Sequence, residues 1–117
     1  MKRGEIWWAD LGDYRPGEQT GRRPVVICQS DALSRALQSV LVVPLTTNLE
    51  RANLAGTSVI APGPDGPPQA SVALAFQMRA IPKSLLKQKL RRLSAEEEEE
   101  LELAIDEALG RAEPVTT

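Results

Sequence analysis

The segment TGRRPVVICQ, residues Thr20 to Gln29, decides the fold because a rigid strand entrance leads into a buried strand. Pro24 has a fixed backbone angle and biases Arg23, the residue before it, towards extended geometry. The run Val25–Cys28 is apolar and mostly β-branched, which is typical of a buried strand. Two adjacent arginines therefore stand where this strand begins, and the second projects from a rigid site.

The rest of the chain is expected to form more short strands and few helices. Residues 62–68, PGPDGPP, must form a turn, because prolines lack the N–H donor that a sheet needs. Residues 85–93 fit either a basic last strand or a helical turn. Runs of aromatic, β-branched and aliphatic residues predict strands at 3–11, 39–45, 57–61 and 70–81, and a Ser-Asp start predicts a short helix at 30–37.

The clearest helix signal lies near the C-terminus. Ser94 and Glu97 have the spacing of a capping box. The glutamates that follow lie at the positive end of the helix dipole, where their negative charge stabilises the helix. We interpret the run of five glutamates as mostly the solvated first turns of this helix, and Gly110 as its stop. An apolar stripe at helical spacing comprises Leu101, Ala104, Ile105, Ala108 and Leu109.

The length of the chain, 117 residues, is enough for one hydrophobic core. We expect a single domain over residues 1–110 and a short C-terminal tail at 111–117. Many short strands and few helices favour a mainly β fold, a small antiparallel barrel or sandwich with the C-terminal helix packed on it. Short apolar runs and the lack of a signal-peptide pattern predict a soluble cytoplasmic protein without a membrane span.

The charge is strongly divided along the chain. Residues 1–93 contain 13 Lys and Arg against 7 Asp and Glu, a net charge of +6. Residues 94–117 contain 1 Arg against 9 Asp and Glu, a net charge of −8. A cationic body favours a polyanionic partner such as nucleic acid, and scattered solubilising lysines are the plainer alternative.

The residue types exclude several kinds of catalytic chemistry. The chain has no histidine, which removes the commonest general base, a Ser-His-Asp triad and the usual metal ligand. Cys28, the only cysteine, lies in an apolar strand and indicates a small buried thiol. Glu5, Asp10 and Asp13 are conceivable as a nuclease metal site, but acids spaced along a strand and turn are more often solvated. We expect no metal or cofactor, and arginine, threonine and backbone remain for phosphate binding.

Several segments, in this order and over almost the whole chain, resemble the MazF/PemK family of toxin ribonucleases. The most specific are GEQTGRRPVV at residues 17–26 and VPLTT at 43–47, and RGEIWWADLG, SVALAFQMRAI and the closing helix accompany them. The resemblance implies an SH3-like (PemK/CcdB-type) β-barrel, a homodimer, and metal-independent cleavage of single-stranded RNA at a short sequence. It also implies a cognate acidic antitoxin that holds the enzyme inactive.

The same resemblance assigns functional positions. It makes Arg23, before Pro-Val-Val, and Thr46, the first of the threonine pair, the catalytic residues, with Glu18 as a candidate base. The proline-rich turn at 62–68 departs from the family pattern, which leaves the RNA sequence preference open. RNA-binding positions implied by these motifs and their neighbours are Gln19, Arg22, Thr47, Asn48, Gln77 and Arg79.

The chemistry of these residue types agrees with the resemblance. The planar fork of Arg23 grips two phosphate oxygens as charge builds on phosphorus, and the Thr46 hydroxyl donates to the same phosphate. The attacking group is then the 2′-hydroxyl of the RNA, so DNA is not cleaved. The sequence leaves open whether the base is Glu18 or an arginine, whose pKa above about 12 makes it a poor base.

Two other function classes remain open. One is a gyrase-poisoning toxin of the same fold, although relatives of that kind act mainly through a C-terminal aromatic segment and this chain ends in RAEPVTT. The other is a nucleic-acid-binding regulator without activity. Trp7 and Trp8 point to opposite faces of their strand, so one is expected in the core and the other at a dimer contact or stacked on a base.

Overall fold

The computed structural model describes residues 1–12 and 20–113 and confirms the mainly β class with a C-terminal helix. The elements that lie before the middle of the chain are β1 (Glu5–Asp10), β2 (Arg22–Ile27), α1 (Asp31–Ala36), β3 (Ser39–Thr46), the 3-10 helix η1 (Leu49–Asn53) and β4 (Thr57–Ile60). The later elements are β5 (Ser71–Leu74), η2 (Ala75–Gln77), β6 (Arg79–Pro82), η3 (Lys83–Leu85), β7 (Leu86–Arg92) and α2 (Ala95–Ala108).

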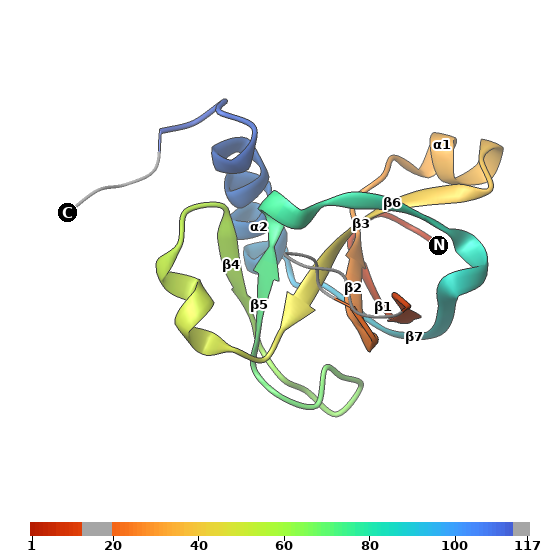
Figure 1. Ribbon diagram of the computed structural model, residues 1–117, viewed down its shortest axis with the longest axis horizontal. Helices are drawn as coiled ribbons and strands as arrows, with labels where there is room; N and C mark the ends of the chain where they lie inside the picture. Colours follow the sequence, from red (N-terminus) through yellow and green to blue (C-terminus); the bar gives the residue numbers. More distant parts are fainter. Residues whose placement is uncertain (13–19, 114–117) are drawn as a thin grey trace.

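The strands form one antiparallel sheet in the order β4-β5-β3-β2-β1-β7, and β6 pairs with β3. One edge of β3 pairs with β6 along its first half and with β5 at its end. The sheet therefore divides along β3 and bends into a barrel-like shape. Figure 1 shows β3 running through the middle of the molecule, with α2 behind β4 and β5 and α1 at the opposite side.

The central strands are buried on both faces, which explains why β2 and β3 are almost continuously apolar. On the first face Val26 and Val43 pack in one cluster with Leu101 of α2, and we call it the helix face. On the second face Val25 and Val42 belong to another cluster, and we call it the far face. Successive side chains of a strand alternate between these faces, so the register decides which functional residues lie together.

The structure corrects one strand prediction and decides between the two alternatives left open for another segment. Residues 70–81 are not one strand, because the chain turns through η2 between β5 and β6. The break is where β3 changes partner, and the Ala75 amide there donates to the Gly56 carbonyl at 2.9 Å. Residues 85–93 are a strand rather than a helical turn, because β7 pairs with β1.

The C-terminal helix begins as predicted. The Ser94 hydroxyl accepts from the Glu97 amide at 3.2 Å, and the Glu97 carboxylate accepts from the Ser94 amide at 2.9 Å, which completes the capping box. Gly110 follows the helix at a φ of 75°, a left-handed conformation that glycine adopts without strain. Leu101 and Ala104 of the predicted apolar stripe are buried, whereas Leu109, the residue that follows α2, is 59% exposed.

One glutamate of the run is not solvated as predicted. The Glu97 carboxylate is buried between α2, β7 and the end of β4, where it accepts two hydrogen bonds from Arg91, at 2.8 and 3.0 Å. It also accepts the Ala61 amide at 3.0 Å. Burial alone would raise the pKa of Glu97, but the hydrogen bonds from Arg91, Ser94 and Ala61 outweigh it and lower the pKa from 4.5 to about 2.

A second buried carboxylate, Glu5 of β1, behaves in the same way. Burial raises its pKa, but hydrogen bonds from the Lys2 amide, Lys89 and Trp7 lower it from 4.5 to about 2. Both groups bind a proton more readily in the unfolded chain than in the folded one, so their contribution to stability is present above about pH 4.5 and is lost as the pH falls towards about 2.

We therefore expect the protein to lose stability in mild acid. The free energy of unfolding should fall by about 2 kcal/mol for each of these carboxylates between about pH 5 and about pH 3, and urea titrations followed by tryptophan fluorescence measure it. The same titrations on Glu97→Gln should give a shallower pH dependence. An equal slope in the two proteins would contradict the role of Glu97.

Candidate phosphate-binding site

The first component of the site is Arg23, the second residue of β2. Its Nε donates to the Thr20 carbonyl at 2.7 Å, and its Nη1 donates to the Leu45 carbonyl of β3 at 3.4 Å. These contacts aim the guanidinium at the end of β3. Partial burial lowers the pKa of Arg23, yet a guanidinium stays protonated in proteins, so the side chain remains a cation.

The second component is Thr46, the last residue of β3. Val25 pairs with Pro44 in the antiparallel register of β2 and β3, so two residues further along Arg23 lies across from Thr46, on the far face. The Thr46 Oγ1 accepts a hydrogen bond from the Asn48 amide at 3.2 Å. Thr46 as a whole is 9% exposed. A hydroxyl that accepts one hydrogen bond keeps its own proton for donation.

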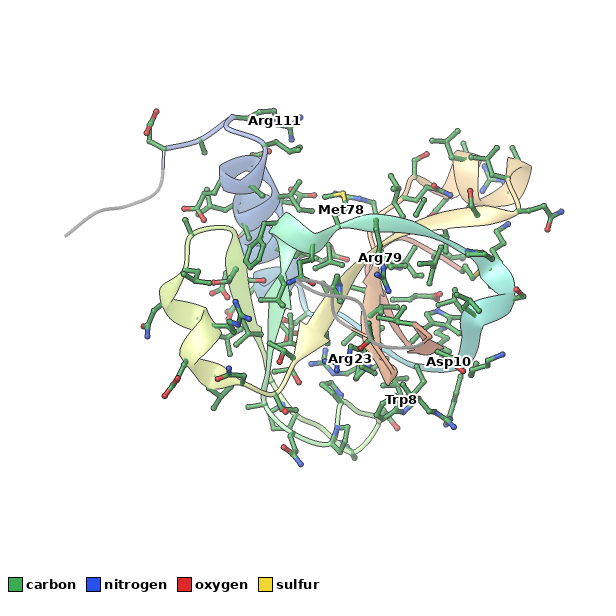
Figure 2. All side chains as sticks on the ribbon, viewed as in Figure 1. Trp8, Asp10, Arg23, Met78, Arg79 and Arg111 are labelled. Carbon is green, nitrogen blue, oxygen red and sulfur yellow. The ribbon has the colours of Figure 1, made fainter. Side chains whose placement is uncertain are left out.

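Arg23 and Thr46 therefore converge from neighbouring strands, as the two-residue prediction requires. A fixed cation and a hydroxyl at one strand end suit an oxyanion whose charge increases during a reaction. Glu18, the candidate base, and Gln19 lie outside the described residues. Figure 2 shows Arg23 near the end of the sheet where β2 begins, with Arg79 above it on β6.

The other predicted RNA-binding residues are divided between the two faces. Arg79 pairs with Val42 and so belongs to the far face, the same face as Arg23, and Gln77 precedes it in η2. Arg22 lies on the helix face, with its guanidinium 5.8 Å from the centre of the Trp8 ring. This contact is a cation–π interaction that the sequence did not predict.

Thr47 and Asn48 follow directly after β3. Thr47 is exposed, whereas the side-chain Oδ1 of Asn48 accepts the Glu50 amide at 3.2 Å and so caps η1. The first threonine is therefore the one that faces Arg23. Asn48 has at least a structural role in fixing the turn that holds the Thr46 hydroxyl.

The conceivable acidic metal site is not assembled by β1. Glu5 is buried and held by Lys2, Trp7 and Lys89, whereas Asp10 is exposed and accepts the Gly12 amide at 3.0 Å. The two acids are separated by an odd number of positions along the strand, so they face opposite sides. Asp13 lies outside the described residues.

The two tryptophans take different roles. Trp7 lies on the far face, packs against the cluster of Val25 and Val42, and donates from Nε1 to Glu5 at 3.2 Å. Trp8 lies on the helix face beside the 62–68 turn and is half-buried. Cys28 donates from Sγ to the Leu41 carbonyl at 3.3 Å, and burial raises its pKa to about 11, so it remains a protonated thiol.

The fold and the site together define a small barrel-like β protein in which an arginine and a threonine lie side by side at the ends of two adjacent strands. Residues 2–109 match the family of PemK-like, MazF-like toxins of type II toxin-antitoxin systems. The chain therefore belongs to this toxin family. Within residues 1–12 and 20–113, no helix has both the length and the apolar character needed to span a membrane.

Curated and solved relatives extend over most of the chain. Endoribonuclease MazF of Staphylococcus saprophyticus is 36% identical over 94% of this chain and 92% of its own length, and that of Staphylococcus epidermidis is 34% identical over the same shares. The Mycobacterium tuberculosis toxin MazF-mt6 superimposes with a TM-score of 0.76 at 27% identity, covering 92% of this chain and 98% of its own. MazF from Deinococcus radiodurans has a TM-score of 0.79 at 21% identity, covering 94% and 96%, and supports the fold alone.

Proposed function

We propose that this protein is a toxin endoribonuclease that cleaves single-stranded RNA at a short sequence, with the substrate's own 2′-hydroxyl as the nucleophile. The observation that carries the proposal is the Arg23 guanidinium on the Leu45 carbonyl, directly beside Thr46. The two staphylococcal relatives named as endoribonucleases support the same class of reaction.

In the proposed reaction the 2′-oxygen attacks phosphorus and the bond to the 5′-oxygen breaks. Arg23 holds the non-bridging oxygens as their charge increases, and the Thr46 hydroxyl donates to the same group. A base removes the 2′-hydroxyl proton, and an acid returns a proton to the leaving 5′-oxygen. The products are a 2′,3′-cyclic phosphate and a 5′-hydroxyl, and no metal takes part.

The proposed inhibitor is an acidic antitoxin, and the proposed assembly is a homodimer. One solved relative is an endoribonuclease in complex with its cognate antitoxin, and others are MazE-MazF complexes. The cationic charge of residues 1–93 suits an acidic segment that folds on binding and displaces RNA. Phe76, 44% exposed, and Ala108 both lie beside Gly56 and form an apolar surface that a second copy would bury.

The test is incubation of the purified protein with a long single-stranded RNA in EDTA, followed by mapping of the new ends. We expect cleavage that leaves 2′,3′-cyclic phosphate and 5′-hydroxyl ends, and no cleavage of DNA with the same sequence. Activity that disappears in EDTA and returns with magnesium would replace this mechanism with a metal-dependent one.

Thr46 is expected to contribute less than Arg23. Thr46→Val keeps the shape of the side chain and removes one neutral hydrogen bond, so single-turnover cleavage should slow by up to about tenfold. Thr47→Val, the same exchange at the neighbouring RNA-binding position, should weaken the binding of RNA and leave the single-turnover rate at saturating protein within about twofold of that of the unmodified protein. If the two variants showed the reverse order, the second threonine would be the one that contacts the phosphate.

A further inference from the structure

A groove lies on the helix face beside the start of β2, on the other side of the sheet from Arg23 and Thr46. Its volume is about 370 Å³, and it runs between the 62–68 turn and the strands β1 and β7. The side chains that could recognise a ligand there are Trp8, Asp65 and Gln88. Figure 2 shows Trp8 at the end of the sheet close to Arg23.

One wall of the groove pairs a flat aromatic ring with an amide. Trp8 and Gln88 are direct partners in the register of β1 and β7, so their side chains stand next to each other on the same face. Gln88 is exposed, and within the described part of the chain its amide makes no hydrogen bond. An aromatic face beside a donor and acceptor group is the combination that proteins use to stack a nucleobase and read its edge.

The opposite wall is a turn with a fixed shape. Arg91 donates from Nε to the Gly66 carbonyl at 2.9 Å and from Nη2 to the Ala61 carbonyl at 2.8 Å. The Gly66 amide donates to the Gly63 carbonyl at 2.9 Å. A Cβ at Gly66, where φ is +92°, would lie 2.9 Å from Leu90, so only glycine fits there. The turn therefore presents Asp65 at its tip from a preorganised backbone.

The polar groups of the groove favour one class of base. A carboxylate accepts hydrogen bonds and donates none, so Asp65 suits the exocyclic amine that cytosine, adenine and guanine carry and uracil lacks. The Gln88 amide can pair with the donor and acceptor of the same edge. Uracil offers carbonyl oxygens in place of that amine, and these repel a carboxylate.

Arg22 connects the groove to the phosphate site. It directly precedes Arg23 in β2, and its guanidinium is 5.8 Å from the centre of the Trp8 ring. Trp8 in turn pairs with Pro24, the residue that directly follows Arg23. A strand of RNA that leaves Arg23 around the start of β2 therefore passes a cation and then meets the Trp8 ring.

We propose that this groove is a base-specificity subsite for a nucleotide that flanks the cleaved phosphate. Trp8 stacks on the base, and Asp65 and Gln88 select a base with an exocyclic amine, that is adenine, cytosine or guanine, against uracil. The proposal rests on the proposed function, because it assigns part of the substrate to the same enzyme. It also explains why the 62–68 turn is built so rigidly at a distance from the catalytic pair.

The first test is cleavage of an RNA library with randomised sequence, with the new ends sequenced. The unmodified protein should discriminate against uracil at one flanking position, and Asp65→Ala should reduce that discrimination by about tenfold without changing the other positions. Trp8→Leu should raise KM by about tenfold with little change in kcat. Glu99→Ala, which removes an exposed carboxylate from α2, is the matched control and should keep the wild-type profile. Identical profiles for Asp65→Ala and the unmodified protein would overturn the proposal.

The second test separates this proposal from the proposed function, because it needs no cleavage. Oligo(dA) and oligo(dC) lack the 2′-hydroxyl and should bind about tenfold more tightly than oligo(dT), and Asp65→Ala should remove the difference. Base-selective binding without cleavage of RNA would support the groove and refute the enzyme. Cleavage of RNA together with equal binding of the three oligonucleotides would refute the groove and keep the enzyme.

Discussion

Arg23→Lys is expected to cleave RNA about 10²–10³ times more slowly than the unmodified protein in single-turnover assays, while its affinity for RNA changes little. Lysine keeps the positive charge but loses the planar fork that contacts two phosphate oxygens at once. Because that contact strengthens as charge builds on phosphorus, its loss affects the chemical step more than the binding of the ground state.

Arg35→Lys is the matched control for this experiment. Arg35 is exposed on α1, which Figure 1 shows away from the start of β2, so the same exchange there should leave the rate unchanged. Circular dichroism and thermal unfolding must show that Arg23→Lys stays folded, since Arg23 also contacts the Thr20 and Leu45 carbonyls. If Arg22→Ala abolished turnover while Arg23→Lys cleaved normally, the two arginines would have exchanged the roles given to them here.

Glu97→Ala is expected to reduce the free energy of unfolding by about 3–5 kcal/mol, the largest effect on stability that we predict. The substitution leaves the Arg91 guanidinium, whose side chain is 21% exposed, without its carboxylate partner, and it opens the capping box of α2. Arg91 also holds the 62–68 turn, so the loss of Glu97 should loosen the groove beside Trp8 as well.

The adjacent residue provides the control for Glu97. Glu98 forms an ion pair with Arg92 at 3.6 Å, but the two side chains are 37% and 59% exposed. An ion pair in water contributes little, so Glu98→Ala should cost less than about 1 kcal/mol in urea denaturation. Equal losses for the two variants would mean that burial of the Glu97 carboxylate is not what makes it important.

The start and end signals of individual elements could be predicted from the sequence because they depend on neighbouring residues. Ser94, Glu97 and Gly110 lie within the helix that they delimit, so the capping box and the stop were correct. The structure places Arg23 next to Thr46, as the resemblance to the family implies, whereas their catalytic roles stay a prediction. The register of β2 and β3 gives this placement a physical basis.

What the sequence could not determine depends on contacts between distant segments. Residues 85–93 carried no pattern that separated strand from helix, so the position of Gln88 beside Trp8 was not available before β7 was seen to pair with β1. In the same way, the partner of Glu97 lies across the start of α2 on β7, and a run of five glutamates gives no sign of which one is buried.

The sequence by itself determined that the chain forms short strands with a capped C-terminal helix, and that an arginine and a threonine stand at strand ends. Only the tertiary structure decided which neighbours the two arginines have, with Arg23 beside Thr46 and Arg22 beside Trp8. The physical reason is that side chains alternate across a strand with period two, so their neighbours are set by which strands pair and in which register.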